Sequence, residues 1–193
     1  MAVTAVTGEI GAGKSTVSAM LARLMGCRLV DADRVAAEVW TRPDVKEAAV
    51  SRWGDGILDA DGGIVKAEVA RRIFADDNEH RFCNALIHPL VMDEIHGLAG
   101  DSDIVAEIPL LPEAGLGKKP SWVGRAVYVM AGFTVRAERC RARGWDDGEL
   151  RRREKFLLPE RERIAVCDYV IRNEGGLSDL EGQAVKFLQE NDR

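Results

Sequence analysis

The chain has 193 residues, a length that favours one domain with a sizeable core, enlarged at most by an insertion. Hydrophobic residues make up 46% and charged residues 31%, which is the balance of a globular protein and excludes a disordered, collagenous or fibrous chain. The formal net charge of -5 argues against a general binder of nucleic acid or of membrane surfaces, so we expect neither as a partner. Any binding site for an anion must therefore be local.

Apolar runs in the sequence all fall short of the roughly 20 residues that a membrane-spanning helix needs. The first seven residues are apolar but lack the basic segment and the cleavage site of a signal peptide, so we predict a cytoplasmic location. The four cysteines are widely spaced and show no zinc-binding pattern. We interpret them as reduced, mostly buried thiols: Cys27, Cys83, Cys140 and Cys167.

The chain begins with an alternation of strands and helices. Residues 2–6 form a short apolar run typical of a buried parallel strand. Apolar side chains at helical spacing then predict a helix over 14–25, which Gly26 would end. Residues 27–30 indicate a second strand, and a further helical pattern follows Asp33. This order favours an α/β fold.

The remaining sequence continues this pattern around one helical segment. Residues 42–99 show no clear strand, and their apolar positions at three- and four-residue spacings predict a helical insertion. The other expected elements are strands over 104–108, 126–130 and 168–171, helices over 134–143 and 149–166 with a break at 144–148, and a closing helix over 177–189. Together they predict a parallel sheet flanked by helices.

The segment from Gly8 to Ser15 matches the complete G-x-x-x-x-G-K-[ST] pattern of a phosphate-binding loop, or P-loop, between a predicted strand and a predicted helix. Its glycines let backbone N–H groups turn toward phosphate oxygens, Lys14 would reach the outer phosphates, and the Ser15 hydroxyl would bind Mg²⁺. ATP or GTP, with Mg²⁺, is the predicted ligand. Glu9 brings a negative charge to the loop, and we expect its side chain to point outward.

Two aspartates follow the second predicted strand. Asp31 and Asp33 lie two residues apart, so in an extended chain they would both point toward the crevice where open α/β sheets bind ligands. A carboxylate there can orient an attacking hydroxyl and accept its proton while a phosphoryl group moves. The alternative is that Asp33 only caps a helix beginning at Arg34. Because a P-loop precedes it, we favour the catalytic interpretation of Asp33.

The segment between Arg136 and Arg163 contains ten basic and seven acidic residues. Arg136, Arg139 and Arg143 have the spacing of one helix face, just before the predicted break. A mobile lid that carries cations over the phosphates would neutralise charge and exclude water. The alternative, a solvated charged helix, is strong for the part from Arg151 to Arg163.

Two further positions carry chemistry that the residues alone leave open. Glu107 ends the third predicted strand, where a carboxylate could hold Mg²⁺ through water or orient an acceptor, and a structural role is equally favoured. His88 precedes Pro89 inside the insertion; a lone histidine is more often structural, and the proline alone explains a bend there.

Taken together, these motifs resemble those of the dephospho-CoA kinase family over nearly the whole chain. The most specific shared elements are Val-Asp-Ala-Asp at 30–33, Ile-His-Pro-Leu at 87–90 and Ile-Pro-Leu-Leu at 108–111. The resemblance implies a single P-loop kinase domain with a core at about 1–40 and 101–193, a helical acceptor-binding insertion at about 41–100, and a lid at about 139–155. It implies transfer of the γ-phosphoryl group of ATP to the ribose 3′-hydroxyl of dephospho-CoA, the last step of coenzyme A synthesis.

The resemblance also assigns roles by position. It implies that Asp33 is the general base, that Lys14, Arg139 and Arg143 are catalytic cations, and that Ser15 binds the metal. ATP would be bound by Gly11, Ala12, Gly13, Lys14, Ser15, Thr16, Asn173 and Gly175. The acceptor would be bound by Asp33, Phe74, His88, Glu107 and Leu110.

Several residues depart from the family pattern, among them Glu9, Val65, Pro112, Gly144 and Leu157. None of these departures affects Lys14, Ser15 or Asp33, so phosphoryl transfer is still expected. The acceptor is less firmly fixed, and two alternatives stay open: a nucleoside or nucleoside monophosphate kinase, and an ATP-binding module without this acceptor. The sequence gives no indication of the oligomeric state.

Overall fold

The computed structural model describes residues 3–100 and 102–191. The chain divides into two compact units: the first combines the chain up to Asp31 with the chain from Ala99 onward, and the second is Ala32–Leu98. The second unit therefore begins before residue 41, where the sequence places the start of the insertion. Among the described residues, no helix combines the length and the apolar character that crossing a membrane would need.

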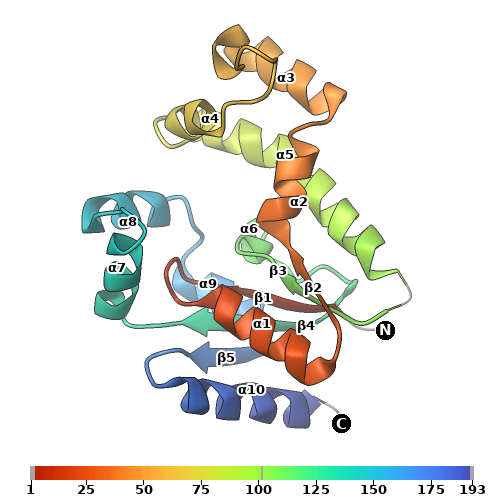
Figure 1. Cartoon of the computed structure of the whole chain (residues 1–193), viewed down its shortest axis with the longest axis vertical. Coiled ribbons are helices and arrows are strands. Elements are labelled where there is room, and N and C mark those ends of the chain that lie inside the picture. Colours follow the sequence, from red (N-terminus) through yellow and green to blue (C-terminus); the bar gives the residue numbers. More distant parts are fainter. Residues whose placement is uncertain (1–2, 101, 192–193) are drawn as a thin grey trace. The chain divides into compact units, whose positions relative to one another are not determined.

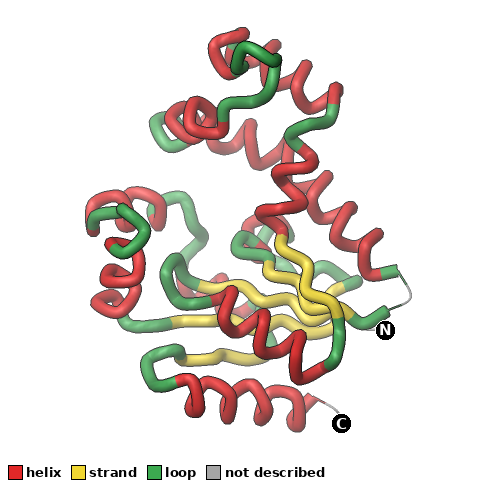
Figure 2. The backbone as a smooth tube through the Cα atoms, in the orientation of Figure 1, coloured by secondary structure: helices red, strands yellow, loops and turns green. Residues whose placement is uncertain are grey.

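The first unit is built on a five-stranded parallel sheet with the strand order β2-β3-β1-β4-β5 (Figures 1 and 2). Most strand residues are apolar and several are β-branched, as in sheets that helices cover on both faces. The prediction of a parallel sheet flanked by helices is confirmed. The strands are β1 Val3–Gly8, β2 Arg28–Asp31, β3 Ile104–Glu107, β4 Val123–Met130 and β5 Tyr169–Arg172.

The register of the sheet brings the carboxyl ends of its central strands together. Glu107, the last residue of β3, is paired with Val6 of β1 on one side and with Asp31 of β2 on the other. Gly8, at the end of β1, lies opposite Val129 of β4. Since the P-loop continues directly from β1, it leaves the sheet at the edge where Asp31 and Glu107 end their strands.

Helix α1, Lys14–Met25, has the bounds that the sequence predicts and ends at Gly26, whose φ of 62° is left-handed. The single helix predicted over 149–166 is wrong, because it is divided into two helices by residues 155–159. Pro159 directly precedes the second of them, where its fixed φ suits a helix start but not a helix interior. The other helices of this unit are α6 Leu111–Ala114, α7 Phe133–Arg141, α8 Asp147–Glu154, α9 Glu160–Ala165 and α10 Leu177–Asn191.

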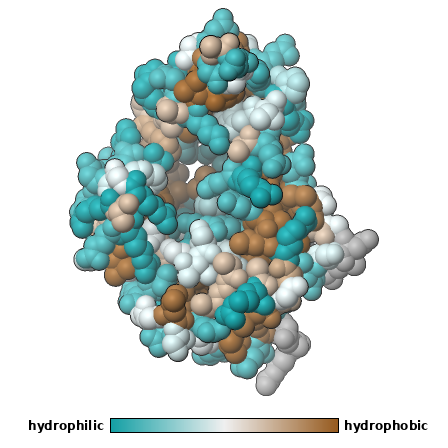
Figure 3. Space-filling model, viewed as in Figure 1, coloured by the Kyte–Doolittle hydropathy of each residue, from teal (hydrophilic) through white to brown (hydrophobic). Residues whose placement is uncertain are grey.

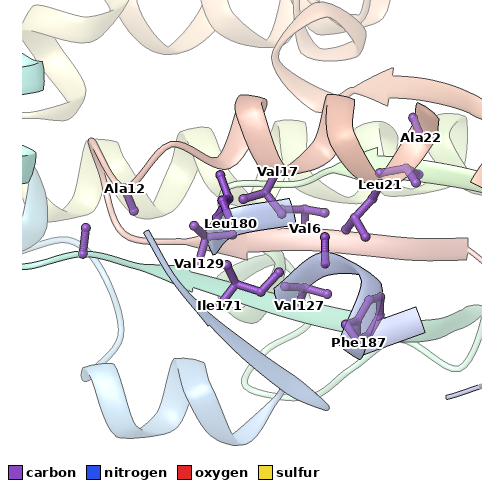
Figure 4. Close-up of a cluster of buried hydrophobic side chains, with 13 residues drawn as sticks. Val6, Ala12, Val17, Leu21, Ala22, Val127, Val129, Ile171, Leu180 and Phe187 are labelled. Atoms are coloured by element: carbon purple, nitrogen blue, oxygen red, sulfur yellow. The ribbon is translucent and has the colours of Figure 1, made fainter. Parts of the chain in front are cut away.

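Helices α1 and α10 pack on one face of the sheet, and their apolar side chains meet those of the strands in one buried cluster (Figure 4). Phe187 of α10 and Leu21 of α1 are fully buried there. Side chains alternate between the two faces along β4, so Tyr128 points to the face opposite this cluster. The guanidinium of Arg163, in α9, lies 5.5 Å from the centre of the Tyr128 ring. Arg163 is only 9% exposed, so the alternative of a solvated charged helix is wrong at this residue.

The second unit is helical, as the sequence predicts. Its small core contains Ala49, Ile57 and Val69, with Trp53 packed against it. The indole N–H of Trp53 donates to Glu79 at 2.6 Å. The elements are α2 Ala32–Val39, α3 Pro43–Trp53, the 3-10 turn η1 Asp55–Ile57, α4 Lys66–Ile73 and α5 Asp77–Ala99, which runs on into the first unit.

On the face drawn in Figure 3, hydrophilic side chains cover much of the surface, and hydrophobic ones form separate patches. The four cysteines are free thiols, as predicted; Cys83 and Cys140 are buried, and Cys27 and Cys167 are half-buried. Burial raises the pKa of Cys83 to about 11 and that of Cys167 to about 12. These thiols are therefore protonated at neutral pH.

Candidate active site

The P-loop depends on glycines at its two ends. Gly8 has a φ of 140°, and a Cβ there would lie 2.0 Å from the carbonyl oxygen of Val129. Gly13 has a φ of 91°, and a Cβ would lie 2.3 Å from Nδ2 of Asn173. No larger residue fits either position without moving its neighbours. The loop is therefore held tightly between β4 and the segment that follows β5.

Lys14 is the first residue of α1 and folds back over the start of its own loop. Its Nζ donates to the carbonyl oxygens of Gly8 at 3.3 Å and of Glu9 at 3.0 Å. The first turn of α1 contains no acidic residue, and Ser15 and Thr16 in that turn are exposed. A helix N-terminus that carries a lysine and no acidic residue of its own is favourable for a phosphate group.

The hydroxyl of Ser15 donates to Oε1 of Glu107 at 3.0 Å. This contact joins the P-loop helix to the end of β3, and it assigns Glu107 a position that the sequence left open. Hydroxyl and carboxylate oxygens are ligands that Mg²⁺ prefers, so the two side chains fit that ion. The described residues contain no group of three or more His, Cys, Asp or Glu side chains that could hold a metal, and a Mg²⁺ here would take its other oxygens from phosphate and water.

Arg139 and Asn173 contact the backbone of the loop. The guanidinium of Arg139 donates to the carbonyl oxygens of Gly11 at 3.3 Å, Ala12 at 3.1 Å and Asn173 at 3.2 Å. The Asn173 side chain is buried and donates to the Ala12 carbonyl at 2.8 Å. The structure thus brings these two predicted site residues to the P-loop.

Two other predicted residues of this unit are placed differently. Arg143 follows the end of α7 and is exposed, so the predicted helix face that includes Arg136, Arg139 and Arg143 does not extend to this residue. Gly175 lies in the segment before α10. A Cβ at Gly175 would lie 2.6 Å from a carboxylate oxygen of Asp179.

The expectation that Glu9 points outward is wrong. Its side chain is buried, with Oε2 2.9 Å from the backbone nitrogen of Ala131 and 3.3 Å from Nε of Arg136. Burial raises the pKa of Glu9, while the Ala131 N–H and the Arg136 charge act in the opposite direction. An arginine far away in the sequence supplies the charge that allows this carboxylate to be buried.

Sequence reasoning missed Glu113, in the short helix α6. One of its carboxylate oxygens accepts the N–H of Leu158 at 3.0 Å, and the other is buried without a hydrogen-bond partner among the described residues. Burial raises the pKa of Glu113, and the charges of Arg163 and Lys14 partly oppose this. The only sequence signal was its place in the Pro-Leu-Leu-Pro-Glu run. Leu110, just before α6, is half-buried.

The second unit has a pocket of its own, with a volume of about 280 Å³. Asp33 and Lys66 are its charged residues, and Trp40, Ile73 and Cys83 belong to its largely apolar lining. Helix α2 begins at Ala32, so Asp33 lies in its first turn. Both the expected extended arrangement of Asp31 with Asp33 and the alternative of a cap before Arg34 are therefore wrong, because the helix starts earlier.

Phe74 and His88 belong to the same unit, but among the described residues they are not part of this pocket lining. The ring of Phe74 lies 6.2 Å from that of His80. His88 is half-buried in α5, and burial lowers its pKa to about 4, with a smaller contribution from His80. His88 is therefore neutral at neutral pH.

Comparison with known proteins decides the family. A sequence profile described as CoaE, dephospho-CoA kinase, matches residues 2–179. The chain belongs to the dephospho-CoA kinase family. A dephospho-CoA kinase of Aquifex aeolicus is 32% identical over 190 residues, which cover 96% of this chain and 95% of that protein.

Solved structures with a similar fold cover nearly the whole chain. The crystal structure of TT1252 from Thermus thermophilus is 30% identical and has a TM-score of 0.78, covering 98% of this chain and 96% of that one. A dephospho-CoA kinase from Campylobacter jejuni, 19% identical, has the same fold with a TM-score of 0.64 and covers 97% of this chain and 96% of that one.

Proposed function

We propose that this chain transfers the γ-phosphoryl group of ATP to the ribose 3′-hydroxyl of dephospho-CoA. The observation that carries the proposal is the P-loop with Lys14 above it and the Ser15–Glu107 contact beside it, in a chain of the dephospho-CoA kinase family. The bond from the γ-phosphorus to the bridging oxygen breaks, a bond to the acceptor oxygen forms, and ADP leaves.

The nucleotide side of the reaction belongs to the first unit. Residues 11–16 would bind the ATP phosphates through backbone N–H groups and the positive end of α1. Lys14 and Arg139 would stabilise the negative charge that develops as the phosphoryl group moves, with Arg143 as a further cation of the lid at about 139–155. Asn173 and Gly175, in the segment after β5, complete the proposed ATP-binding residues.

Ser15 and Glu107 would hold Mg²⁺, the hydroxyl directly and the carboxylate directly or through water. Held there, Mg²⁺ would supply positive charge that offsets the negative charge of the ATP phosphates. The Ser15–Glu107 hydrogen bond keeps both oxygen donors in place at the end of the loop.

The acceptor side of the reaction is assigned to the second unit, with Asp33 as the general base that takes the proton of the 3′-hydroxyl. Support comes from the position of Asp33 at a pocket whose other lining is mostly apolar and which also contains Lys66. Such a lining suits a ligand with both apolar and anionic parts. Phe74 and His88 of this unit are further proposed acceptor contacts, and the first unit would add Glu107 and Leu110. A cytoplasmic location stays a prediction.

One experiment separates this function from the alternatives. ADP release from ATP and Mg²⁺ is measured with dephospho-CoA, with adenosine or with AMP as the acceptor. We expect stimulation by dephospho-CoA alone. Stimulation by adenosine or AMP instead would assign a nucleoside or nucleotide kinase, and binding of ATP without stimulation by any acceptor would leave an ATP-binding module.

A further inference from the structure

Glu9 and Arg136 form an ion pair in the interior of the first unit, between the P-loop and α7. Oε2 of Glu9 lies 3.3 Å from Nε of Arg136, and each side chain is 8% exposed. Both side chains also bind the backbone of Ala131. The Ala131 N–H donates to Glu9 at 2.9 Å, and Arg136 Nε donates to the Ala131 carbonyl oxygen at 2.9 Å. The pair is therefore fixed by backbone as well as by charge.

Arg136 connects this pair to the loop and to the next helix. Its Nη1 donates to the carbonyl oxygen of Ile10 at 3.3 Å and also contacts the carboxylate of Glu154 in α8. The start of α7 lies so close to the loop that a Cβ at Gly11 would be 2.8 Å from the Arg136 carbonyl oxygen. Arg136 thus joins α7 and α8 to the P-loop.

Arg139 stands three residues after Arg136, on the same face of α7. Its guanidinium donates to the carbonyl oxygens of Gly11 and Ala12, directly before Gly13 and Lys14. Because one helix carries both arginines, the orientation of α7 that Arg136 fixes also determines where the Arg139 guanidinium lies. A small rotation of α7 would move Arg139 away from the loop.

The burial of Arg136 depends on an opposite charge, since an unpaired buried guanidinium would be costly. Glu154 of α8 and Glu9 of the P-loop both supply such a charge, and Glu9 is the more deeply buried of the two, with its side chain 8% exposed against 27% for Glu154. Arg163 and Glu160 of α9 also act electrostatically on Glu9. We propose that Glu9 is a positioning residue, which holds Arg136 and thereby sets the orientation of α7 in which Arg139 supports the P-loop for ATP. This inference rests on the proposed role of Arg139 in nucleotide binding.

A double-mutant cycle on ATP affinity tests the proposal. Glu9→Gln keeps the shape of the side chain and removes its charge, and Arg139→Ala removes the guanidinium. We expect each variant to weaken binding of MgATP about tenfold in calorimetric titrations, the scale of losing a hydrogen bond to a charged group. The double variant should bind within about twofold of Arg139→Ala, since residues that act through one another are not additive.

Two outcomes would overturn the role of Glu9: unchanged affinity in Glu9→Gln, or losses that multiply in the double variant. Arg136→Gln provides a second way to break the pair and should give the same loss and the same non-additivity, even where Glu9→Gln fails to fold. The matched control is Glu138→Gln, which makes the same change of charge at an exposed position of α7 and should bind MgATP like the unmodified chain. An equal loss in this control would also overturn the proposal.

The titrations need no acceptor, so they are independent of the acceptor proposed above. Should dephospho-CoA fail to stimulate ADP release in the unmodified chain, the proposed function falls, while the cycle still decides the role of Glu9. An unmodified chain that does not bind MgATP would overturn both.

Discussion

The Ser15 hydroxyl and the Glu107 carboxylate, 3.0 Å apart, connect the P-loop helix to the neighbouring strand. Ser15 is the second residue of α1, and Glu107 is the last residue of β3. The parallel register places Glu107 beside Val6, two residues before Gly8, and this position brings the carboxylate next to the start of α1. The candidate metal ligands thus come from the first turn of α1 and the carboxyl end of β3.

Replacing Glu107 by glutamine keeps an oxygen that can accept from Ser15 but removes the negative charge. We expect the Mg²⁺ concentration required for half-maximal ATP binding to rise about tenfold, because a charge-assisted contact to the ion is lost. Calorimetric ATP titrations at a series of Mg²⁺ concentrations measure this. Asp103→Asn, an exposed aspartate just before β3, is the control, and an unchanged Mg²⁺ dependence in Glu107→Gln would remove this residue from the metal site.

Lys14→Ala should abolish turnover, with kcat at least about 100-fold lower, because it removes the ammonium group that would stabilise the negative charge developing as the phosphoryl group moves. Alanine continues the helix start, so thermal unfolding should stay close to that of the unmodified chain. The assay is ADP release at saturating acceptor, with the exposed Lys118→Ala as the control. Near-normal activity of Lys14→Ala would mean that the loop does not act as a P-loop.

Asp33→Asn should leave ATP affinity unchanged and lower kcat by roughly 100-fold or more, the usual effect of losing a general base. The amide fits the first turn of α2 but cannot accept the hydroxyl proton. ADP release and ATP titration together separate the two effects. Glu38→Gln changes an exposed carboxylate of the same helix and should retain full activity; a kcat unaffected by Asp33→Asn would exclude Asp33 as the base.

His88 should make the free energy of unfolding depend on pH. Its pKa is lowered from 6.5 to about 4 in the folded chain, so below pH 6.5 the unfolded chain binds the proton more readily. Stability should therefore fall as pH drops from 6.5 toward 4, by up to about 1.4 kcal/mol per pH unit from this group.

Urea unfolding at pH 7 and pH 5 measures this contribution. His88→Gln should lose less stability between the two pH values than the unmodified chain. His96→Gln, an exposed position on the same helix, should behave like the unmodified chain. Equal losses in the His88 variant and the unmodified chain would show that His88 does not titrate as the structure indicates.

The regular elements could be predicted because their signals are local. Helix α1 required only the spacing of its apolar residues and Gly26, and the parallel sheet followed from apolar runs that alternate with helices. The division between α8 and α9 is not evident from the sequence pattern, because residues 155–159 contain no glycine and are mostly apolar, and Pro159 is their one helix-breaking residue.

The candidate site was predicted less completely, because its contacts join distant parts of the chain. The P-loop and Lys14 follow from one motif, whereas the Ser15–Glu107 contact depends on strand register. Glu9 looked like a surface residue, since nothing near it in the sequence indicates that Arg136 covers it. Burial of a charge is decided by its partner, and that partner is set by the tertiary structure.

The low reactivity of the four native thiols makes it possible to attach a label selectively to the segment 139–155. Thiolates, not thiols, react with maleimides, and burial raises the pKa of Cys27, Cys83 and Cys167. Cys140 is itself enclosed in the cluster that joins α7 to α8. A cysteine introduced at the exposed Ala142 would therefore be modified well before the native ones, and a single fluorescent label could be attached beside Arg143 with all four native cysteines retained.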